Sequence, residues 1–111
     1  MQKIELVAQS ECLGGVSEAL RKAKVGPFRA SGVTIFDPAA PLDGSYRGGR
    51  YAVGRQCVKL ELIVPDHDLE PAIKAIREGI DAFGQGEAEL LVLTVRDSVR
   101  LYPSPRKRAT R

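Results

Sequence analysis

The stretch "CVKLELIVPDHDLEPAIKAIREGIDAF" (residues 57–83) decides the fold, because it joins one clear strand to one clear helix. Every second residue from Val58 to Val64 is apolar, which predicts a strand with one buried face that ends at Pro65. From about Leu69 to Ala82 the apolar residues recur at helical spacing and predict an amphipathic helix. The residues expected to face inward are Val58, Leu60, Leu62 and Val64 on the strand, and Leu69, Ala72, Ile73, Ile76 and Ile80 on the helix.

The segments on either side complete a βαββαβ order. Upstream, "KIELVAQ" (3–9) alternates and predicts a strand, a helix begins at Ser10 or Glu11, and "FRASGVTIF" (28–36) predicts a second strand. Downstream, "LLVLTV" (90–95) predicts a last strand that is buried on both faces or lies at a subunit contact. This order predicts an α+β fold of the ferredoxin-like type, with a four-stranded antiparallel sheet and two helices. Because that fold carries many unrelated functions, the order alone predicts no activity.

The composition is typical of a globular domain, with 43% apolar and 28% charged residues in a chain of 111. No apolar run approaches the ~20 residues of a membrane-spanning helix, and the N-terminus does not resemble a signal peptide. Two cysteines, Cys12 and Cys57, without a Cys-x-x-Cys motif favour a cytoplasmic protein with free thiols over a disulfide.

The net charge of +3 arises at the C-terminal end, where "SPRKRATR" (104–111) is rich in arginine and lysine. We interpret residues 103–111 as a disordered, solubilising tail, since no basic stripe continues into the remaining chain. A nucleic-acid partner is not expected, because the predicted strands also lack the exposed aromatic residues of an RNA-binding sheet.

No constellation of residues favours catalysis or a metal site. Asp66, His67, Asp68 and Glu70 gather in "PDHDLE" (65–70), but carboxylates at a helix start are common capping residues, so Asp66 or Asp68 is expected to cap the helix. The chain has no Gly-x-Ser-x-Gly motif, and its lone histidine does not sit in a zinc-binding Cys/His cluster. We therefore expect a protein that is not an enzyme and that holds no metal.

About twenty residues, Asp37 to Gln56, show no clear period and predict a long loop between the second and third strands. Its centre, "YRGGRYAV" (46–53), combines tyrosines and arginines with two adjacent glycines. A second glycine-rich segment, "GQGEAE" (84–89), follows the second helix. Glycine loops and arginines together are typical of sites for phosphate or another anion.

Five blocks in order resemble the PII signal-transduction proteins, the nitrogen regulatory protein P-II family, over about residues 1–102. "MQKIELV" resembles the family's "MKKIEAI", "LGGVSEAL" its "LDEVKEAL", and "YRGGRYAV" its "YRGAEYVV" at the centre of the loop called the T-loop. "VKLELIVPDHDLEPAIKAI" is similar to "VKIEIVVPDDDVDAVVEAI", and "GQG" followed by "LLVLTVRDSVRL" is similar to "GDGKIFVLPVEDAIRI". The chain is identified as a divergent PII-like member, with residues 1–102 as one domain, the T-loop at about 37–56 and the tail at 103–111.

The resemblance implies a compact homotrimer that binds adenine nucleotides in its inter-subunit clefts. The nucleotide would set the shape of the T-loop, and the T-loop would dock on a transporter or an enzyme. The nucleotide-binding residues that it implies are Phe28, Arg29, Glu61, Ile63, Gly84, Gln85, Gly86 and Arg100. The residues that it implies for contact with a partner or an anion are Tyr46, Arg47, Gly48, Arg50, Tyr51, Arg55 and Lys59.

The chain departs from the family pattern where the triphosphate of ATP would lie. "IFDPAAP" (35–41) stands in place of "GFGRQKG" and lacks the glutamine that helps to hold Mg-ATP and 2-oxoglutarate. Cys57 and Tyr102 replace basic residues, and Glu87 and Glu89 bring two carboxylates that would repel a triphosphate. We therefore expect ADP or AMP to be preferred over Mg-ATP, with a small anion such as bicarbonate as the second effector.

Other functions remain open at the level of the sequence. The chain could be a structural trimer like the CutA stress proteins, which lack the nucleotide cleft, or a nitrogen-regulatory member that senses ATP and 2-oxoglutarate. A cyclic dinucleotide is another second ligand found among PII-like groups. Tyr51 matches the tyrosine that some members carry uridylylated, but Arg50 replaces the usual acidic neighbour, so modification of Tyr51 is not expected.

Overall fold

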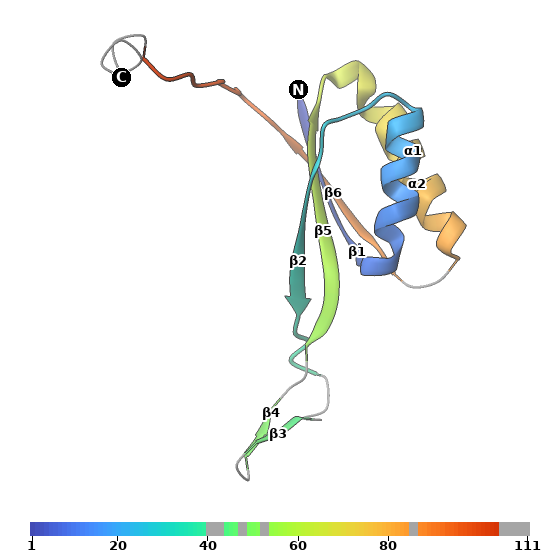
Figure 1. The fold of residues 1–111 in the computed structure, drawn as a ribbon, viewed down its shortest axis with the longest axis vertical. Helices are drawn as coiled ribbons and strands as arrows, with labels where there is room; N and C mark the ends of the chain where they lie inside the picture. The colour runs from blue at the N-terminus through green and yellow to red at the C-terminus, as the bar shows by residue number, and fades with distance from the viewer. Residues whose placement is uncertain (40–43, 47–48, 52–53, 85–86, 105–111) are drawn as a thin grey trace.

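The computed structural model describes residues 1–39, 44–46, 49–51, 54–84 and 87–104 of the chain (Figure 1). Short 3-10 turns, Ser10–Cys12 and Asp66–Asp68, lead into the two helices. The strands and helices, in chain order, are β1 (Gln2–Gln9), α1 (Leu13–Lys22), β2 (Arg29–Ile35), β3 (Gly44–Tyr46), β4 (Gly49–Tyr51), β5 (Arg55–Val64), α2 (Leu69–Phe83) and β6 (Glu89–Thr94).

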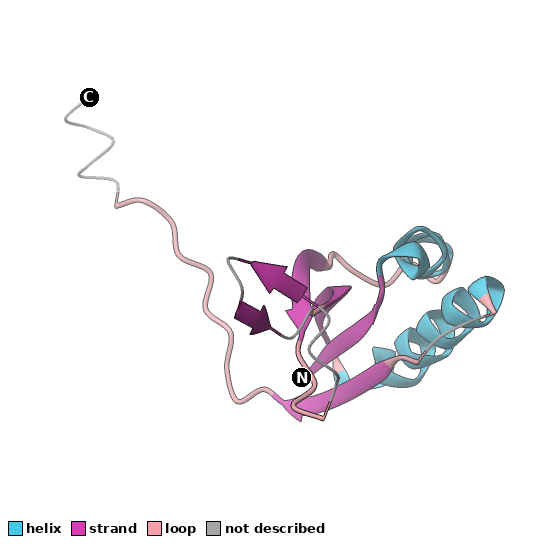
Figure 2. Cartoon of the chain, turned by 90° about the horizontal axis from the view of Figure 1, so that it is seen from below, coloured by secondary structure: helices cyan, strands magenta, loops and turns pink. Residues whose placement is uncertain are grey.

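Four strands form one antiparallel sheet in the order β2-β5-β1-β6. Both helices cover the same face of this sheet, and the other face is uncovered in the single chain (Figures 1 and 2). Two helices on one side of a sheet with this order are the ferredoxin-like α+β arrangement, so the predicted fold class is confirmed. Because β1 and β5 lie at the centre of the sheet, their outward-pointing side chains form the middle of the uncovered face.

The core lies between the helices and the sheet, and it contains the residues that the sequence pattern predicts to face inward. On the strands, Ile4, Leu6 and Leu60 are at most 1% exposed, and Leu62 and Val64 are nearly as buried. The helix residues that close the core from the other side are Val16, Leu20, Ala72, Ala75 and Ile76. The alternation predicted for the first and third strands of the sheet is therefore confirmed.

The two helices cross at a pair of glycines, Gly15 and Gly79. A methyl carbon built on Gly79 would lie 2.5 Å from the Cα atom of Val16 and 2.6 Å from its backbone nitrogen. Real side chains do not make contacts this short, so the absence of a side chain allows the two helix backbones to approach. The glycine pair thus sets how closely α1 and α2 pack over the sheet.

β6 lies at the edge of the sheet, so of the two expectations for this segment, burial on both faces or a place at a subunit contact, the structure contradicts the first. Among the described strands it pairs with β1 alone. Leu91, Val92 and Leu93 are 49%, 43% and 43% exposed. A continuous apolar run looks like a buried strand in the sequence, but it carries no information about its place in the sheet. Beyond β6, residues 95–104 continue without regular secondary structure (Figure 1).

Part of the segment predicted to lack regular structure forms a small hairpin. β3 and β4 pair antiparallel, with Gly44 opposite Tyr51 and Tyr46 opposite Gly49, and they lie apart from the main sheet (Figure 1). The third strand of the main sheet also begins earlier than expected, so that Arg55 and Gln56 belong to β5. Strands of three residues are too short to show a period, which is why the pattern did not reveal them.

The carboxylates before α2 do not cap the helix as predicted. Asp68 occupies the N-cap position of α2 without a capping hydrogen bond from its side chain. Asp66 instead accepts hydrogen bonds from the N-terminal ammonium of Met1 at 2.6 Å and from the side-chain amide of Gln2 at 3.2 Å. Asp66 therefore joins the start of β1 to the turn after β5, a contact between distant segments that a local motif cannot reveal.

Candidate functional site

The candidate site lies on the uncovered face of the sheet. The residues that alternate with the core residues on the two central strands point to this face, since successive side chains of a strand point to opposite sides. In the register of the sheet, Glu61 lies opposite Glu5 of β1 and opposite Arg29 of β2, and Lys59 lies opposite Val7. The side chains that β1 and β5 place on this face include Lys3, Glu5, Val7, Lys59, Glu61 and Ile63.

Four of these side chains, Lys3, Glu5, Lys59 and Glu61, form a network that we call the charge quartet. The ammonium of Lys3 lies 2.8 Å from a carboxylate oxygen of Glu61 and 3.0 Å from one of Glu5. The ammonium of Lys59 lies 4.0 Å from both carboxylates. All four side chains are only 19–33% exposed. Lys3 therefore makes the close contacts of the quartet, and Lys59 adds a more distant positive charge.

Within the quartet, the charged forms of Lys3 and Glu61 are stabilised. Hydrogen bonds to Glu61 and then to Glu5 raise the pKa of the Lys3 ammonium. The hydrogen bond from Lys3 lowers the pKa of the Glu61 carboxyl, and the positive charges of Lys3, Lys59 and Arg29 lower it further. Glu61 is therefore an ionised carboxylate at neutral pH, which can accept hydrogen bonds but cannot donate one.

Glu61 and Lys3 line a cavity of about 390 Å³ that we call the Glu61 pocket. β2 and the residues before it contribute an aromatic ring and a guanidinium, Phe28 and Arg29, while the segment after β6 contributes Ser98 and Arg100. The complete lining is Lys3, Pro27, Phe28, Arg29, Glu61, Leu62, Ile63, Ser98 and Arg100.

The positive charge of the Glu61 pocket exceeds its negative charge. Within the part of the chain that the structure describes, no carboxylate forms an ion pair with Arg29 or Arg100. The one carboxylate in the lining, Glu61, is already paired with Lys3. The pocket thus combines an aromatic ring, a hydrogen-bond acceptor and two guanidinium groups that can pair with phosphate or another anion.

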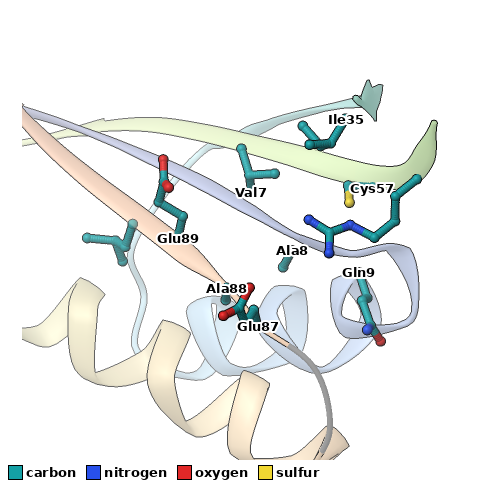
Figure 3. Close-up of a pocket in the computed structure, with 10 residues that line it drawn as sticks. Val7, Ala8, Gln9, Ile35, Cys57, Glu87, Ala88 and Glu89 are labelled. Atoms are coloured by element: carbon teal, nitrogen blue, oxygen red, sulfur yellow. The ribbon is translucent and has the colours of Figure 1, made fainter. Parts of the chain in front are cut away.

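A second cavity, of about 620 Å³, lies at the other end of the same sheet and is called here the loop-end pocket (Figure 3). Cys57 comes from β5, while Glu87 and Glu89 come from the segment that enters β6 (Figure 3). Its lining contains one arginine, Arg55, against the two carboxylates, so its charge is opposite to that of the Glu61 pocket. The complete lining is Val7, Ala8, Gln9, Ile35, Arg55, Cys57, Glu87, Ala88, Glu89 and Leu90.

The structure brings together five of the eight residues predicted to bind a nucleotide, because all five line the Glu61 pocket. Gly84 instead ends α2 in the left-handed conformation, with φ of 75°, which explains a glycine there without a ligand. Gln85 and Gly86 lie outside the described residues. The five that line the pocket are Phe28, Arg29, Glu61, Ile63 and Arg100.

The residues predicted for contact with a partner or an anion are more dispersed. Lys59 belongs to the charge quartet, and Arg55 lines the loop-end pocket. Tyr46, Arg50 and Tyr51 belong to the β3–β4 hairpin, whereas the prediction for Arg47 and Gly48 falls outside the described residues.

Two parts of the site were missed in the sequence. Lys3 was not predicted, although strand alternation places it on the same face as Glu61 and could have revealed it. The loop-end pocket itself is not predicted, because its walls come from four separate segments, although the sequence singles out Arg55, Cys57, Glu87 and Glu89 of its lining. Cys57, which is buried in that wall, is a free thiol, as is Cys12.

Two kinds of feature, a cluster of metal ligands and a membrane-spanning helix, are absent from the described residues. Across residues 1–39, 54–84 and 87–104, and in the hairpin strands, no three His, Cys, Asp or Glu side chains gather closely enough to hold a metal ion. None of the helices in these segments is long and apolar enough to cross a membrane.

Comparison with known proteins relates more than 90% of the chain to one family, although no protein-family model matches the chain. The nitrogen regulatory protein P-II 1 of Methanothermobacter thermautotrophicus is 31% identical over 102 residues, which cover 91% of this chain and 89% of that protein. The nitrogen regulatory protein P-II of Mesorhizobium japonicum is 29% identical over 102 residues, or 91% of both chains. That of Rhodospirillum rubrum is 27% identical over 107 residues, or 96% of both chains.

Proposed function

The chain belongs to the nitrogen regulatory protein P-II family, and we propose that it is a cytoplasmic regulatory protein, not an enzyme, that binds adenine nucleotides. The observation that carries this proposal is the Glu61 pocket, where residues from β1, β2, β5 and the C-terminal segment meet. Its size and its mixture of apolar, acceptor and cationic groups suit a small ligand with an aromatic base and a negative charge.

Each part of that lining has a complementary part of a nucleotide. Phe28 offers a ring against which a base can pack, and Glu61 offers an acceptor for the amino group of adenine. Arg29 and Arg100 can form charge-assisted hydrogen bonds with phosphate oxygens. We place these pockets in the inter-subunit clefts of a homotrimer, as the family resemblance implies.

We propose further that ADP or AMP is preferred over Mg-ATP. The loop-end pocket presents Glu87 and Glu89, which would repel a third phosphate directed towards them. The segment "IFDPAAP" lacks the glutamine expected for Mg-ATP and 2-oxoglutarate, so a small anion such as bicarbonate is the proposed second effector. The T-loop would report the ligand to a transporter or an enzyme.

Calorimetry and thermal unfolding of the full chain test the proposal. ADP and AMP should bind and raise the midpoint of unfolding, because ligand at a hundredfold excess over its dissociation constant stabilises the folded state by about 2.7 kcal/mol. Mg-ATP should bind more weakly, and bicarbonate, but not 2-oxoglutarate, should change the affinity for ADP. If none of the three nucleotides binds, a structural trimer of the CutA type becomes the better hypothesis.

A substitution of Arg100 tests whether the nucleotide binds in the Glu61 pocket. Arg100→Ala should lower the affinity for ADP by about tenfold or more, since a hydrogen bond to a charged group contributes about 1.5–3 kcal/mol. Arg96→Ala is the matched control, because it removes the same charge from the same segment while Arg96 is absent from the lining of the Glu61 pocket. Equal affinities of the two variants for ADP would place the nucleotide elsewhere.

A further inference from the structure

Two strands of the main sheet lead into the T-loop, and a contact between them closes its base (Figure 1). β2 and β5 pair as far as Ile35 and Arg55, and the next residues outward are Phe36 and Gly54. A methyl carbon built on Gly54 would lie 2.9 Å from two carbon atoms of the Phe36 ring and 2.1 Å from the side-chain methyl of Thr34. The ring and the methyl group therefore fill the space that any side chain at position 54 would need.

The glycine is required by this close contact and not by its backbone conformation. Among the glycines that the structure describes, a positive φ occurs at Gly26 and Gly84 only, so other residues could adopt the backbone of Gly54. The methyl group of Thr34 is held in place, because its hydroxyl donates a hydrogen bond of 3.4 Å to the side-chain carbonyl of Gln56 and a β-branched side chain has few rotamers. A side chain at position 54 would therefore push the aromatic ring away.

The contact of Phe36 with Gly54 is independent of the core. The ring of Phe36 is 61% exposed, whereas Phe28 and Phe83 pack against the core. Phe36 and Gly54 also lie beyond the last paired residues of β2 and β5. A cross-strand pair of this kind contributes a modest stabilisation, so it can open while the core between the sheet and the helices stays closed.

The residues next to this contact form part of the wall of the loop-end pocket. Ile35 and Arg55, which adjoin Phe36 and Gly54 in the sequence, line that pocket together with Cys57. Ile35 and Cys57 border the same hollow in Figure 3, and Cys57 is only 5% exposed. Separation of Phe36 from Gly54 would free the ends of β2 and β5 and would therefore uncover Cys57.

We propose that Phe36 and Gly54 form a clasp at the base of the T-loop, which holds the ends of β2 and β5 together and keeps this wall of the loop-end pocket closed. Movement of the T-loop relative to the sheet would have to open the clasp, and so would the entry of a ligand that displaces Ile35 or Arg55. The inference does not depend on nucleotide binding in the Glu61 pocket, because that pocket lies at the other end of the sheet.

Hydrogen exchange of the full chain measures how often the clasp opens. Gly54→Ala and Phe36→Ala should each lower the protection of the backbone amides in residues 33–35 and 55–57 by about two- to fivefold, the size of one cross-strand pair. The double variant should lose less than the product of the two single losses, because both substitutions remove the same contact. Phe36→Tyr, which keeps the ring, should retain the protection of the unaltered chain.

Gly32→Ala is the matched control for Gly54→Ala. It adds the same methyl group to a glycine of β2, but at a position where this group would meet no atom within 4 Å. The protection of the amides at the base of the T-loop should therefore stay unchanged in Gly32→Ala.

Alkylation of the thiols gives an independent measure of the same opening. Iodoacetamide, followed by mass spectrometry, should modify Cys57 about two- to fivefold faster in Gly54→Ala and Phe36→Ala than in the unaltered chain. Cys12, which is 3% exposed and belongs to the core, is the internal control, and its rate should not change. Gly32→Ala should leave the rates of both thiols unchanged.

The outcomes separate a local clasp from general stability. If neither Gly54→Ala nor Phe36→Ala changes the protection at the base of the T-loop or the labelling of Cys57, the clasp is overturned. It is also overturned if Cys12 reacts faster by the same factor as Cys57, or if the amides at the centre of β1 and β5 lose equal protection, because the substitutions would then weaken the whole chain. Absence of ADP binding would overturn the proposed function but not the clasp.

Discussion

The two faces of the four-stranded sheet are built from the same strands but follow different physical rules. The face under α1 and α2 is apolar and closed, with Leu60 only 1% exposed. The other face carries the charge quartet, and Glu61, the next residue along β5, is 27% exposed. One face is held by burial of apolar surface, and the other keeps charged groups paired at the surface of the chain. Along β5, residues that build the core therefore alternate with residues that belong to the candidate site.

The largest effect on stability is expected from a substitution in the core, on the face of the sheet that the helices cover. Leu60→Ala leaves a cavity between β5 and the helices, and a buried leucine replaced by alanine lowers the free energy of unfolding by about 2–5 kcal/mol. Domains of this size have about 5–15 kcal/mol in total, so this loss is a large fraction of their stability. Urea unfolding followed by circular dichroism measures it.

Lys59→Ala is the matched control for Leu60→Ala, because it changes the neighbouring residue on the opposite face of the same strand. Lys59 is 33% exposed and makes only contacts of 4.0 Å, so its loss should lower the free energy of unfolding several-fold less than Leu60→Ala does. Equal losses at the two positions would contradict the view that the covered face alone carries the stability of the single chain.

A smaller effect is expected within the helical layer that covers the sheet. Gly79→Ala places a methyl group 2.5 Å from the Cα atom of Val16, so α1 and α2 must move apart. Overpacking of this kind lowers the free energy of unfolding by about 1–3 kcal/mol. Thermal and urea unfolding should show the loss, while the affinity for ADP, whose proposed site lies on the other face, should stay unchanged.

Gly14→Ala is the control for Gly79→Ala. A methyl group on Gly14 would meet no atom within 4 Å, so the substitution should raise stability by up to about 1 kcal/mol through the helix propensity of alanine. Opposite signs at the two glycines would show that the close helix crossing, and not glycine in a helix as such, decides the result. A loss at Gly14 equal to that at Gly79 would contradict this.

The sequence could predict what repeats locally, and it failed where the partner lies far along the chain. The alternation of Leu60 with Glu61 was enough to place the core, and the family resemblance pointed to the arginine and aromatic residues of the Glu61 pocket. The close crossing at Gly79, the edge position of β6 and the bond of Asp66 to the N-terminal ammonium depend on tertiary contacts. No period or motif encodes such contacts, because each joins segments whose separation in the sequence has no fixed value.

The smallest effect on stability is expected for a substitution of Asp66, in the turn that follows β5. The N-terminal ammonium and then Gln2 hold the pKa of the Asp66 carboxyl below its ordinary value. A lowered pKa in the folded state adds stability above the ordinary carboxyl pKa of about 3.9, and this stability is lost as the pH falls through the lowered value. The advantage of the unaltered chain over Asp66→Asn should therefore be constant from about pH 5 to pH 7 and should shrink below about pH 4.

Added salt distinguishes the ion pair between Asp66 and the N-terminal ammonium from the burial of apolar side chains. Because Asp66 is 73% exposed, the difference between the unaltered chain and Asp66→Asn should be small and should shrink further in 1 M salt, where charges are screened within about 3 Å. The effect of Leu60→Ala, which is apolar, should not shrink in the same way. Asp68→Asn, which removes a carboxylate of the same turn that does not bind the ammonium, should follow the acid limb of the unaltered chain. A pH-independent loss in Asp66→Asn would show that Asp66 acts through its shape or its bond to Gln2, and not through its charge.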